Sequence, residues 1–108
     1  MSLVSIILPA RNAEATIENS IKSVLIQNYE DFELLIVVND SKDKTLEIAN
    51  SYDDKRIRVL ESSAGIVPAL NVGLQNSKGK YIARQDADDV WYQDKLKLQV
   101  ERLDVGDV

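Results

Sequence analysis

Short apolar runs alternate along this chain with segments of helical periodicity, and no other feature constrains the fold as strongly. Four runs, at residues 4–9, 32–38, 57–60 and 81–83, are rich in β-branched and other apolar residues and too short for buried helices, which predicts four strands. The second run contains five consecutive aliphatic residues, 34–38, a pattern typical of a strand that is buried on both faces.

The segments between these runs carry apolar residues every three or four positions, which predicts amphipathic helices. We expect helices at residues 13–27, in a short segment after residue 43, between Gly65 and Gly79, and at residues 93–103. Ser41 or Asp43 can cap the short second helix through a side-chain oxygen. Pro68 near the start of the third helix and Gly79 after its end follow the usual positional preferences of these residue types.

A strand, a helix and a strand, repeated three times, predict the α/β class: a Rossmann-like, mostly parallel sheet with right-handed crossovers and helices on both faces. Ligands bind to such sheets beyond the carboxyl ends of the strands, where the strand order reverses. Polar side chains gather at the predicted strand ends, at Arg11, Asn12, Asn39 and Asp40 and at residues 86–89. With 108 residues, the chain forms one domain or part of one.

The composition removes several classes of chemistry. The chain has no cysteine and no histidine, which excludes thiol nucleophiles, Ser-His catalysis and imidazole metal sites, so a bound metal ion must have oxygen ligands. The 18 acidic against 13 basic residues, with an isoelectric point near 4.6, argue against a nucleic-acid partner. No aliphatic run exceeds five residues and no secretion signal opens the chain, so we expect no membrane span and a cytoplasmic location, including the cytoplasmic face of the membrane.

Three aspartates, Asp86, Asp88 and Asp89, follow the fourth predicted strand. Carboxylates at this spacing repel one another unless a cation offsets their charge. Mg²⁺ or Mn²⁺ typically uses one or two carboxylates together with phosphate oxygens, so the cluster predicts a divalent metal site that faces a nucleotide diphosphate. The alternative is that Asp88 or Asp89 caps the helix that follows. The two interpretations are compatible, and the residues alone favour neither.

Asn39 and Asp40 end the second predicted strand and suit contact with the edge of a nucleobase, through a side-chain oxygen that accepts an imide N–H. An ordinary turn stabilised by either side chain is the alternative. Residues 9–12 form either a rigid segment that lines a ligand or a simple turn. Neither Gly-x-Gly-x-x-Gly nor Gly-x4-Gly-Lys-Ser/Thr occurs, so neither standard phosphate loop is available.

Four segments in this order, residues 4–12, 29–34, 38–45 and 78–89, closely resemble the nucleotide-binding half of family 2 glycosyltransferases with the GT-A fold. The resemblance covers essentially the whole chain. It implies that residues 1–108 bind a nucleotide-sugar donor, a UDP-sugar, together with a divalent cation, Mn²⁺ or Mg²⁺. The implied activity is transfer of the sugar, with inversion, to a hydroxyl of a glycan or lipid-linked acceptor.

The resemblance also assigns the residues that hold the base. Pro9, Ala10 and Arg11 match the strand exit that flanks the nucleobase in the family. Asn39 falls where the family usually has its base-reading aspartate when residues 32–43 are aligned without a gap. Asp40 then stands where a glycine is common, so the nucleotide-binding set implied here includes both residues.

By the same resemblance, Asp86 matches the first aspartate of the family's Asp-x-Asp motif, which touches the ribose and the metal-diphosphate, and Asp88 matches the second, which ligates the metal. Leu70 replaces an arginine that many relatives carry. The family's catalytic base and acceptor site belong to a C-terminal half that these 108 residues do not contain. We therefore expect a donor-binding fragment that holds no catalytic base and is inactive by itself.

Two other classes of protein combine an α/β sheet with acidic metal ligands. A sugar-nucleotide nucleotidyltransferase normally has a glycine-rich, basic loop after its first strand, and residues 9–13 do not have that composition. A receiver-like magnesium-binding module places its acid pair after the first strand and its phosphorylated aspartate after the third, whereas here the acids follow the fourth.

Overall fold

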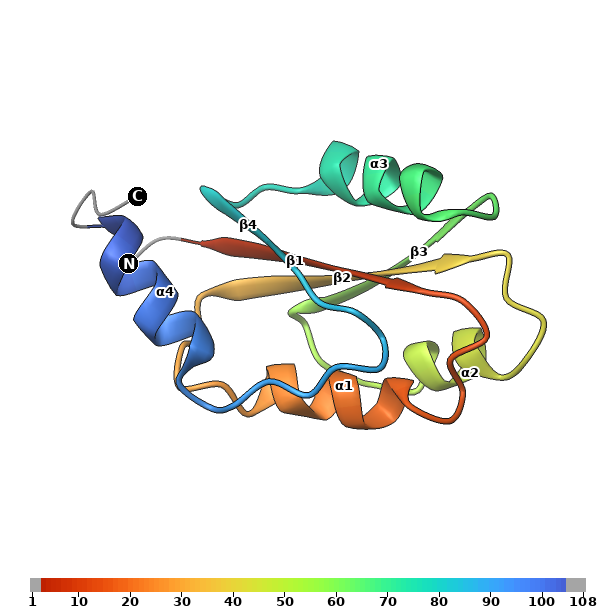
Figure 1. The fold of residues 1–108 in the computed structure, drawn as a ribbon, viewed down its shortest axis with the longest axis horizontal. Helices are drawn as coiled ribbons and strands as arrows, with labels where there is room; N and C mark the ends of the chain where they lie inside the picture. The colour runs from red at the N-terminus through yellow and green to blue at the C-terminus, as the bar shows by residue number, and fades with distance from the viewer. Residues whose placement is uncertain (1–2, 105–108) are drawn as a thin grey trace.

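Four parallel strands form one sheet in the order β3-β2-β1-β4, in a computed structural model that describes residues 3–104. The elements along the chain are β1 (Val4–Ala10), α1 (Ile17–Leu25), β2 (Phe32–Asn39), α2 (Thr45–Asn50), β3 (Ile57–Ser62), α3 (Ile66–Asn76), β4 (Tyr81–Arg84) and α4 (Lys95–Asp104). The structure confirms the predicted Rossmann-like α/β class, and in the described residues the sheet is entirely parallel (Figure 1).

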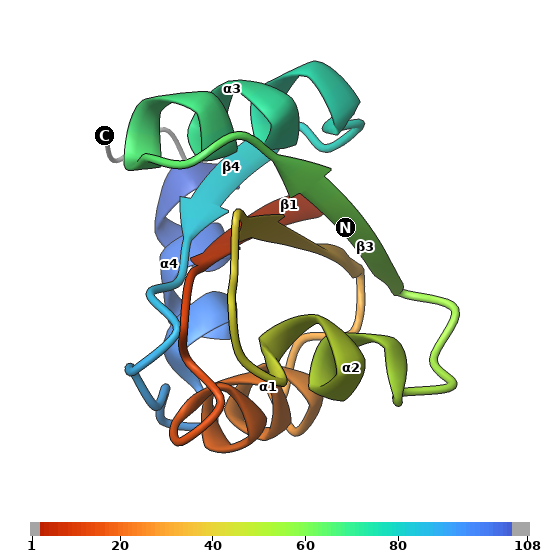
Figure 2. The same cartoon turned by 90° about the vertical axis from the view of Figure 1, so that its right-hand side faces the viewer.

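Helices cover both faces of the sheet, as the sequence predicted. α3 lies on one face, whereas α1 and α2 lie on the other, and Figure 2 shows the sheet between these two layers. Alternate residues of the central strands supply the two cores, so that Ile6 and Leu8 pack toward α1 and α4 while Ile7 packs toward α3. All residues of β1 are buried, because a strand at the centre of a doubly covered sheet has no solvent face.

The strand order fixes where a ligand can bind. The first two crossovers take the chain from β1 to β2 and then to β3, and the third returns it past β1 to β4. The direction of winding therefore reverses between β1 and β4, and their carboxyl ends form the topological switch point. In open α/β sheets, ligands bind in the crevice beyond the strand ends at such a point.

Some helix boundaries differ from the prediction. α1 spans Ile17–Leu25 rather than residues 13–27, and α4 begins at Lys95 rather than at residue 93. Residues 13–16 form a turn closed by the Thr16 N–H to the Ala13 carbonyl at 3.0 Å, and the chain enters that turn through Asn12 with φ of 49°. Within residues 3–104, no helix combines the length and the apolar composition that crossing a bilayer requires.

Candidate functional site

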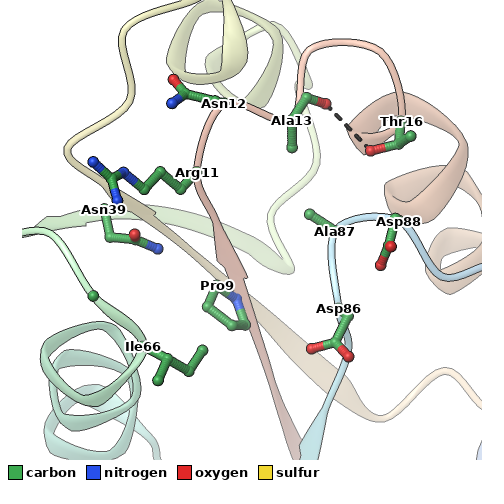
Figure 3. A pocket seen from close by; sticks show the side chains of 11 residues that line it. Pro9, Arg11, Asn12, Ala13, Thr16, Asn39, Ile66, Asp86, Ala87 and Asp88 are labelled. Carbon is green, nitrogen blue, oxygen red and sulfur yellow. Dashed lines mark hydrogen bonds between the residues drawn. The ribbon is translucent and has the colours of Figure 1, made fainter.

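A pocket of about 450 Å³ lies at the switch point, beyond the carboxyl ends of β1, β2 and β4. Its walls come from the loop after β1, the end of β2, the start of α3 and the turn after β4, and they are formed by Pro9, Arg11, Asn12, Ala13, Thr16, Asn39, Gly65, Ile66, Asp86, Ala87 and Asp88. Figure 3 shows Arg11 and Asn39 on one side of this pocket and Asp86 and Asp88 on the other, with Pro9 between them. A second pocket of similar volume lies between β4 and α4, and the described residues that line it include basic but not acidic side chains.

The acidic wall of the pocket is the turn that follows β4. Carboxylate oxygens of Asp86, Asp88 and Asp89 lie within 4.8 Å of one another. The turn is closed by the Asp89 N–H, which donates to the Asp86 carbonyl at 3.0 Å, and Arg84 Nε donates to Asp86 Oδ1 at 3.0 Å. Three convergent carboxylates are a suitable ligand set for a hard divalent cation, which prefers oxygen donors.

The alternative reading of these aspartates as helix caps is wrong. α4 begins at Lys95, so residues 90–94 separate Asp89 from the helix. A capping side chain must reach the backbone N–H groups of the first turn, and a residue this far upstream is not at the capping position. Capping therefore does not explain the acidic cluster.

The strand exit after β1 contributes to the pocket unevenly. Pro9 and Arg11 line it, whereas the side chain of Ala10 is buried in the core on the α1 side of the sheet. Ala10 takes part through its backbone, because its carbonyl oxygen accepts a hydrogen bond from Asn39 Nδ2 at 3.3 Å. This bond holds the Asn39 amide with its nitrogen toward β1 and its oxygen on the opposite side.

Asn39 and Asp40 are separated by the structure. Asn39 is 5% exposed and lines the pocket. Asp40 has left the strand with φ of 51°, is exposed, and pairs with Lys42 at 3.2 Å outside the pocket lining. A positive φ suits glycine best, so the backbone at Asp40 is consistent with the glycine that is common at this position in the family that the sequence resembles.

The carboxylate of Asp43 binds both the segment after β2 and the loop that precedes α1. It accepts from the Thr45 N–H at 2.9 Å, from Thr45 Oγ1 at 2.5 Å, from Ser41 Oγ at 3.1 Å and from the Glu14 N–H at 3.1 Å. The hydrogen bond from Thr45 is the main reason that the pKa of Asp43 is lowered to about 2. The cap position of α2 is occupied by Lys44, whose side chain makes no capping bond, and not by Ser41 or Asp43 as predicted. Asp43, one position earlier, accepts a hydrogen bond from the Thr45 N–H at the start of the helix.

Two further bonds attach the pocket-lining loop to the segment after β2. The Ala13 N–H donates to Thr45 Oγ1 at 2.8 Å, and the Asn12 N–H donates to Ser41 Oγ at 2.7 Å. Sequence reasoning did not identify Thr45 as part of the site. No local signal identifies it, because its backbone partner Ala13 lies 32 positions away in the sequence.

A parallel sheet with a pocket at its switch point and an acidic turn after the fourth strand is the architecture of glycosyltransferases with the GT-A fold. The crystal structure of S. aureus TarS 1-349 in complex with UDP superposes with a TM-score of 0.85 at 28% sequence identity, over 94% of this chain and 32% of that one. Glucosyl-3-phosphoglycerate synthase from Mycobacterium tuberculosis, in complex with Mn²⁺, UDP and phosphoglyceric acid, gives a TM-score of 0.76 at 26% identity, over 94% of this chain and 39% of that one.

The chain belongs to the family described as Glycosyl transferase family 2, which matches residues 5–108. Among curated relatives, WfgD of Escherichia coli, named as a UDP-Glc:alpha-D-GlcNAc-diphosphoundecaprenol beta-1,3-glucosyltransferase, is 43% identical over 103 residues. The match covers 94% of this chain and 41% of WfgD, so the chain spans about two fifths of that relative.

Proposed function

We propose that this chain is the donor-binding part of an inverting, metal-dependent glycosyltransferase that uses a UDP-sugar. The observation that carries the proposal is the pocket at the switch point, with a polar base-side wall at Asn39 and an acidic wall at Asp86 and Asp88. A nucleotide diphosphate matches these two walls. Its flat base has hydrogen-bonding edges that suit the polar wall, and its diphosphate needs a neutralising cation, which the acidic wall can bind. Membership of Glycosyl transferase family 2 supports the same reading.

On the base side, we assign nucleobase contact to Pro9, Arg11 and Asn39. Pro9 and Arg11 form the strand exit, and the Asn39 amide, fixed by the Ala10 carbonyl, presents its oxygen to an imide N–H of uracil. Ala10 contributes through its carbonyl rather than its side chain. Asp40, the other residue expected there, lies outside the pocket lining, so we do not assign it a direct contact with the base.

On the acidic side, we assign the divalent cation to Asp88 and Asp86, with Mn²⁺ or Mg²⁺ as the ion. The donor chemistry fits, since carboxylate oxygens from three aspartates converge within 4.8 Å. When bound, such an ion supplies positive charge where the leaving diphosphate becomes more negative. The Mn²⁺ and UDP in the related mycobacterial synthase structure support this assignment.

We assign neither acceptor binding nor the catalytic base to any of residues 1–108. The proposal therefore includes that the isolated chain binds donor but does not transfer sugar, with a glycan or lipid-linked hydroxyl as the acceptor of the whole protein. The name of WfgD, which refers to a diphosphoundecaprenol acceptor, supports this acceptor class. The cytoplasmic location expected from the sequence stays a prediction.

The two rival classes have weaker support. A nucleotidyltransferase needs a basic, glycine-rich loop after β1, and the segment there folds as a turn held to Ser41 and Thr45. A receiver module needs its acids after the first and third strands, whereas the acidic turn follows β4. Treatment with acetyl phosphate followed by mass spectrometry separates these readings, because only a receiver gains a phosphate.

Calorimetry with UDP tests the proposal directly. We expect the 108-residue chain to bind UDP, and to bind it more tightly in Mn²⁺ or Mg²⁺ than in a metal chelator. Titration with Mn²⁺ alone provides the reference for metal binding without nucleotide. Equal UDP affinity in metal and in chelator would contradict the assigned metal site, and sugar transfer by the isolated chain would contradict the assignment of the base to another part of the protein.

A further inference from the structure

Gln85, immediately before the acidic turn, is a polar side chain that is 0% exposed. Its Nε2 donates to Ser20 Oγ at 2.7 Å and to the Asp89 carbonyl at 2.8 Å. Ser20, in α1, donates in turn from Oγ to the Asp86 carbonyl at 3.0 Å. The backbone carbonyls at both ends of the acidic turn are therefore held by one pair of buried neutral side chains.

This arrangement solves a problem that the acidic turn presents. Three carboxylates within 4.8 Å repel one another, and in the absence of a cation the repulsion favours any change of the turn that separates them. Within residues 3–104, the ion pair recorded for this cluster joins Arg84 to Asp86, and it is half-exposed and therefore weak. Gln85 and Ser20 restrain the backbone beneath the turn and use no carboxylate oxygen to do so, which leaves those oxygens free to face a cation.

Stability alone does not account for Gln85. Among the residues that the structure describes, its Oε1 is a buried atom without a hydrogen-bond partner, and such an atom costs free energy of desolvation. An apolar side chain of the same length would fill the space between β4 and α1 without that cost. What an apolar side chain would lose is the bond to Asp89 and the orientation of Ser20.

We propose that Gln85 is a positioning residue which, together with Ser20, holds the backbone of the acidic turn so that Asp86 and Asp88 converge on the metal-diphosphate of the donor. The proposal rests on the donor-binding function proposed above. Gln85 acts through the turn and does not itself touch the nucleotide. Groups that orient metal ligands in this way typically change metal affinity by about 10-fold to 100-fold when they are removed.

The chain offers a matched control in a second buried glutamine. Gln27 is 5% exposed, and its Nε2 donates to the Ser23 carbonyl at 3.0 Å and the Tyr92 carbonyl at 2.7 Å. Its Oε1 accepts from the Leu96 N–H at 3.1 Å, so both ends of this amide are bonded. Gln27 joins α1 to the start of α4 and contacts no residue of the acidic turn through these bonds.

The test compares Gln85→Met and Gln27→Met with the wild-type chain. UDP is titrated by calorimetry in Mn²⁺ and in EDTA, Mn²⁺ is titrated alone, and each protein is melted without ligand. We expect Gln85→Met to weaken UDP binding in Mn²⁺ by about 10-fold or more, and Mn²⁺ binding alone in the same direction, with little change in EDTA. Gln27→Met should lower the melting temperature at least as much and leave the difference between Mn²⁺ and EDTA intact.

Three outcomes overturn the inference. The first is that UDP binding by Gln85→Met depends on Mn²⁺ as strongly as in the wild type. The second is that both variants lose affinity in proportion to the fall in their melting temperatures, which would make Gln85 a structural residue only. If Gln85→Met does not fold, Ser20→Ala makes the same test by removing a single hydroxyl, and wild-type behaviour there has the same meaning. UDP binding by the wild-type chain that is independent of Mn²⁺ contradicts the proposed metal function itself, so the two failures are distinguishable.

Discussion

Replacing Gly73 by alanine sets two opposing effects against each other, and the structure decides which one prevails. Gly73 lies in the interior of α3 and is buried against β1. A Cβ atom there would lie 2.6 Å from Ile7 Cγ2 and 3.0 Å from its Cγ1 and Cδ1. Ile7 is 2% exposed, and its Cγ2 is attached directly to Cβ, so this methyl group cannot rotate away without moving the whole side chain.

Helix propensity alone predicts that Gly73→Ala stabilises the protein by about 1 kcal/mol, because alanine loses less backbone entropy than glycine on folding. Overpacking of a buried contact costs about 1 to 3 kcal/mol. We take the upper end of that range because all three contacts are at or inside 3.0 Å and involve a stiff, β-branched side chain. The expected net result is a loss of about 2 kcal/mol, or roughly 10 °C in melting temperature for a domain of this size.

Urea unfolding followed by the fluorescence of Trp91, which is buried in the main core, measures the effect. Asn71→Ala is the control, since Asn71 is exposed in the same helix and its replacement changes propensity without a new contact. In an Ile7→Leu background, which moves the branch away from Cβ, the cost of Gly73→Ala should fall by about 1 kcal/mol. Stabilisation by Gly73→Ala in the wild-type background would refute the reasoning, because it would mean that α3 moves away from β1 at almost no cost.

Three further predictions concern the pocket. Asp88→Asn should cause a large loss of UDP affinity in Mn²⁺ and a small one in chelator, whereas a loss at Asp88 that is independent of metal would argue against its assignment as a ligand. Asn39→Ala should weaken UDP binding equally with and without metal, by about 1 to 3 kcal/mol; calorimetry that finds the effect only in Mn²⁺ contradicts the base-side assignment. Because hydrogen bonding to Thr45 lowers the pKa of Asp43 from 3.8 to about 2, the stabilisation from its ionised form is complete above the unfolded pKa and is lost as the pH falls through this window. Urea series between pH 5 and pH 2 should therefore show a shallower loss of stability for Asp43→Asn than for the wild type, and parallel curves would contradict the role of this carboxylate.

The strands were predictable because each one is a short apolar run that can be recognised in the local sequence. In β2, residues 34–38 are apolar without interruption, and the structure buries them on both faces between α1 and α3. The strand order β3-β2-β1-β4 was not predicted, since the right-handed crossovers of a parallel sheet do not by themselves decide which strands are neighbours. The position of the pocket then followed from the sequence, because polar residues gather where those strands end.

The start of α1 was not predictable from local sequence. The N–H groups of Ala13 and Glu14 bind Thr45 and Asp43, which are about thirty positions away, instead of serving as the free first turn of a helix. No periodicity in residues 13–27 records these partners. The periodicity therefore predicted a helix over residues 13–16, where long-range hydrogen bonds stabilise a turn instead.

The buried polar residues carried a signal that was not used. Ser20 lies three residues after Ile17 and four before Val24, both on the buried stripe of α1, so its hydroxyl had to be buried with them. A buried hydroxyl needs a partner, which the structure supplies at Asp86 and Gln85. The sequence could predict that Ser20 is bonded, but only the fold could say that its partner belongs to the acidic turn.

These contacts make α1 the element that both walls of the pocket share. The loop that precedes it is fixed to Thr45 and Asp43, on the side proposed for the base, and Ser20, one turn into the helix, is fixed to the acidic turn. The covalent link between a base and a diphosphate in one nucleotide limits their separation, so a site that binds both gains from a rigid element that spans the two contacts. The bonds at the two ends of this element involve different residues. Loss of the Thr45 hydroxyl should therefore weaken UDP binding equally in Mn²⁺ and in chelator, whereas loss of the Ser20 hydroxyl should weaken it mainly in Mn²⁺. The same pattern of loss in both variants would mean that α1 moves as one rigid body and couples the two walls, and would contradict local support of each wall.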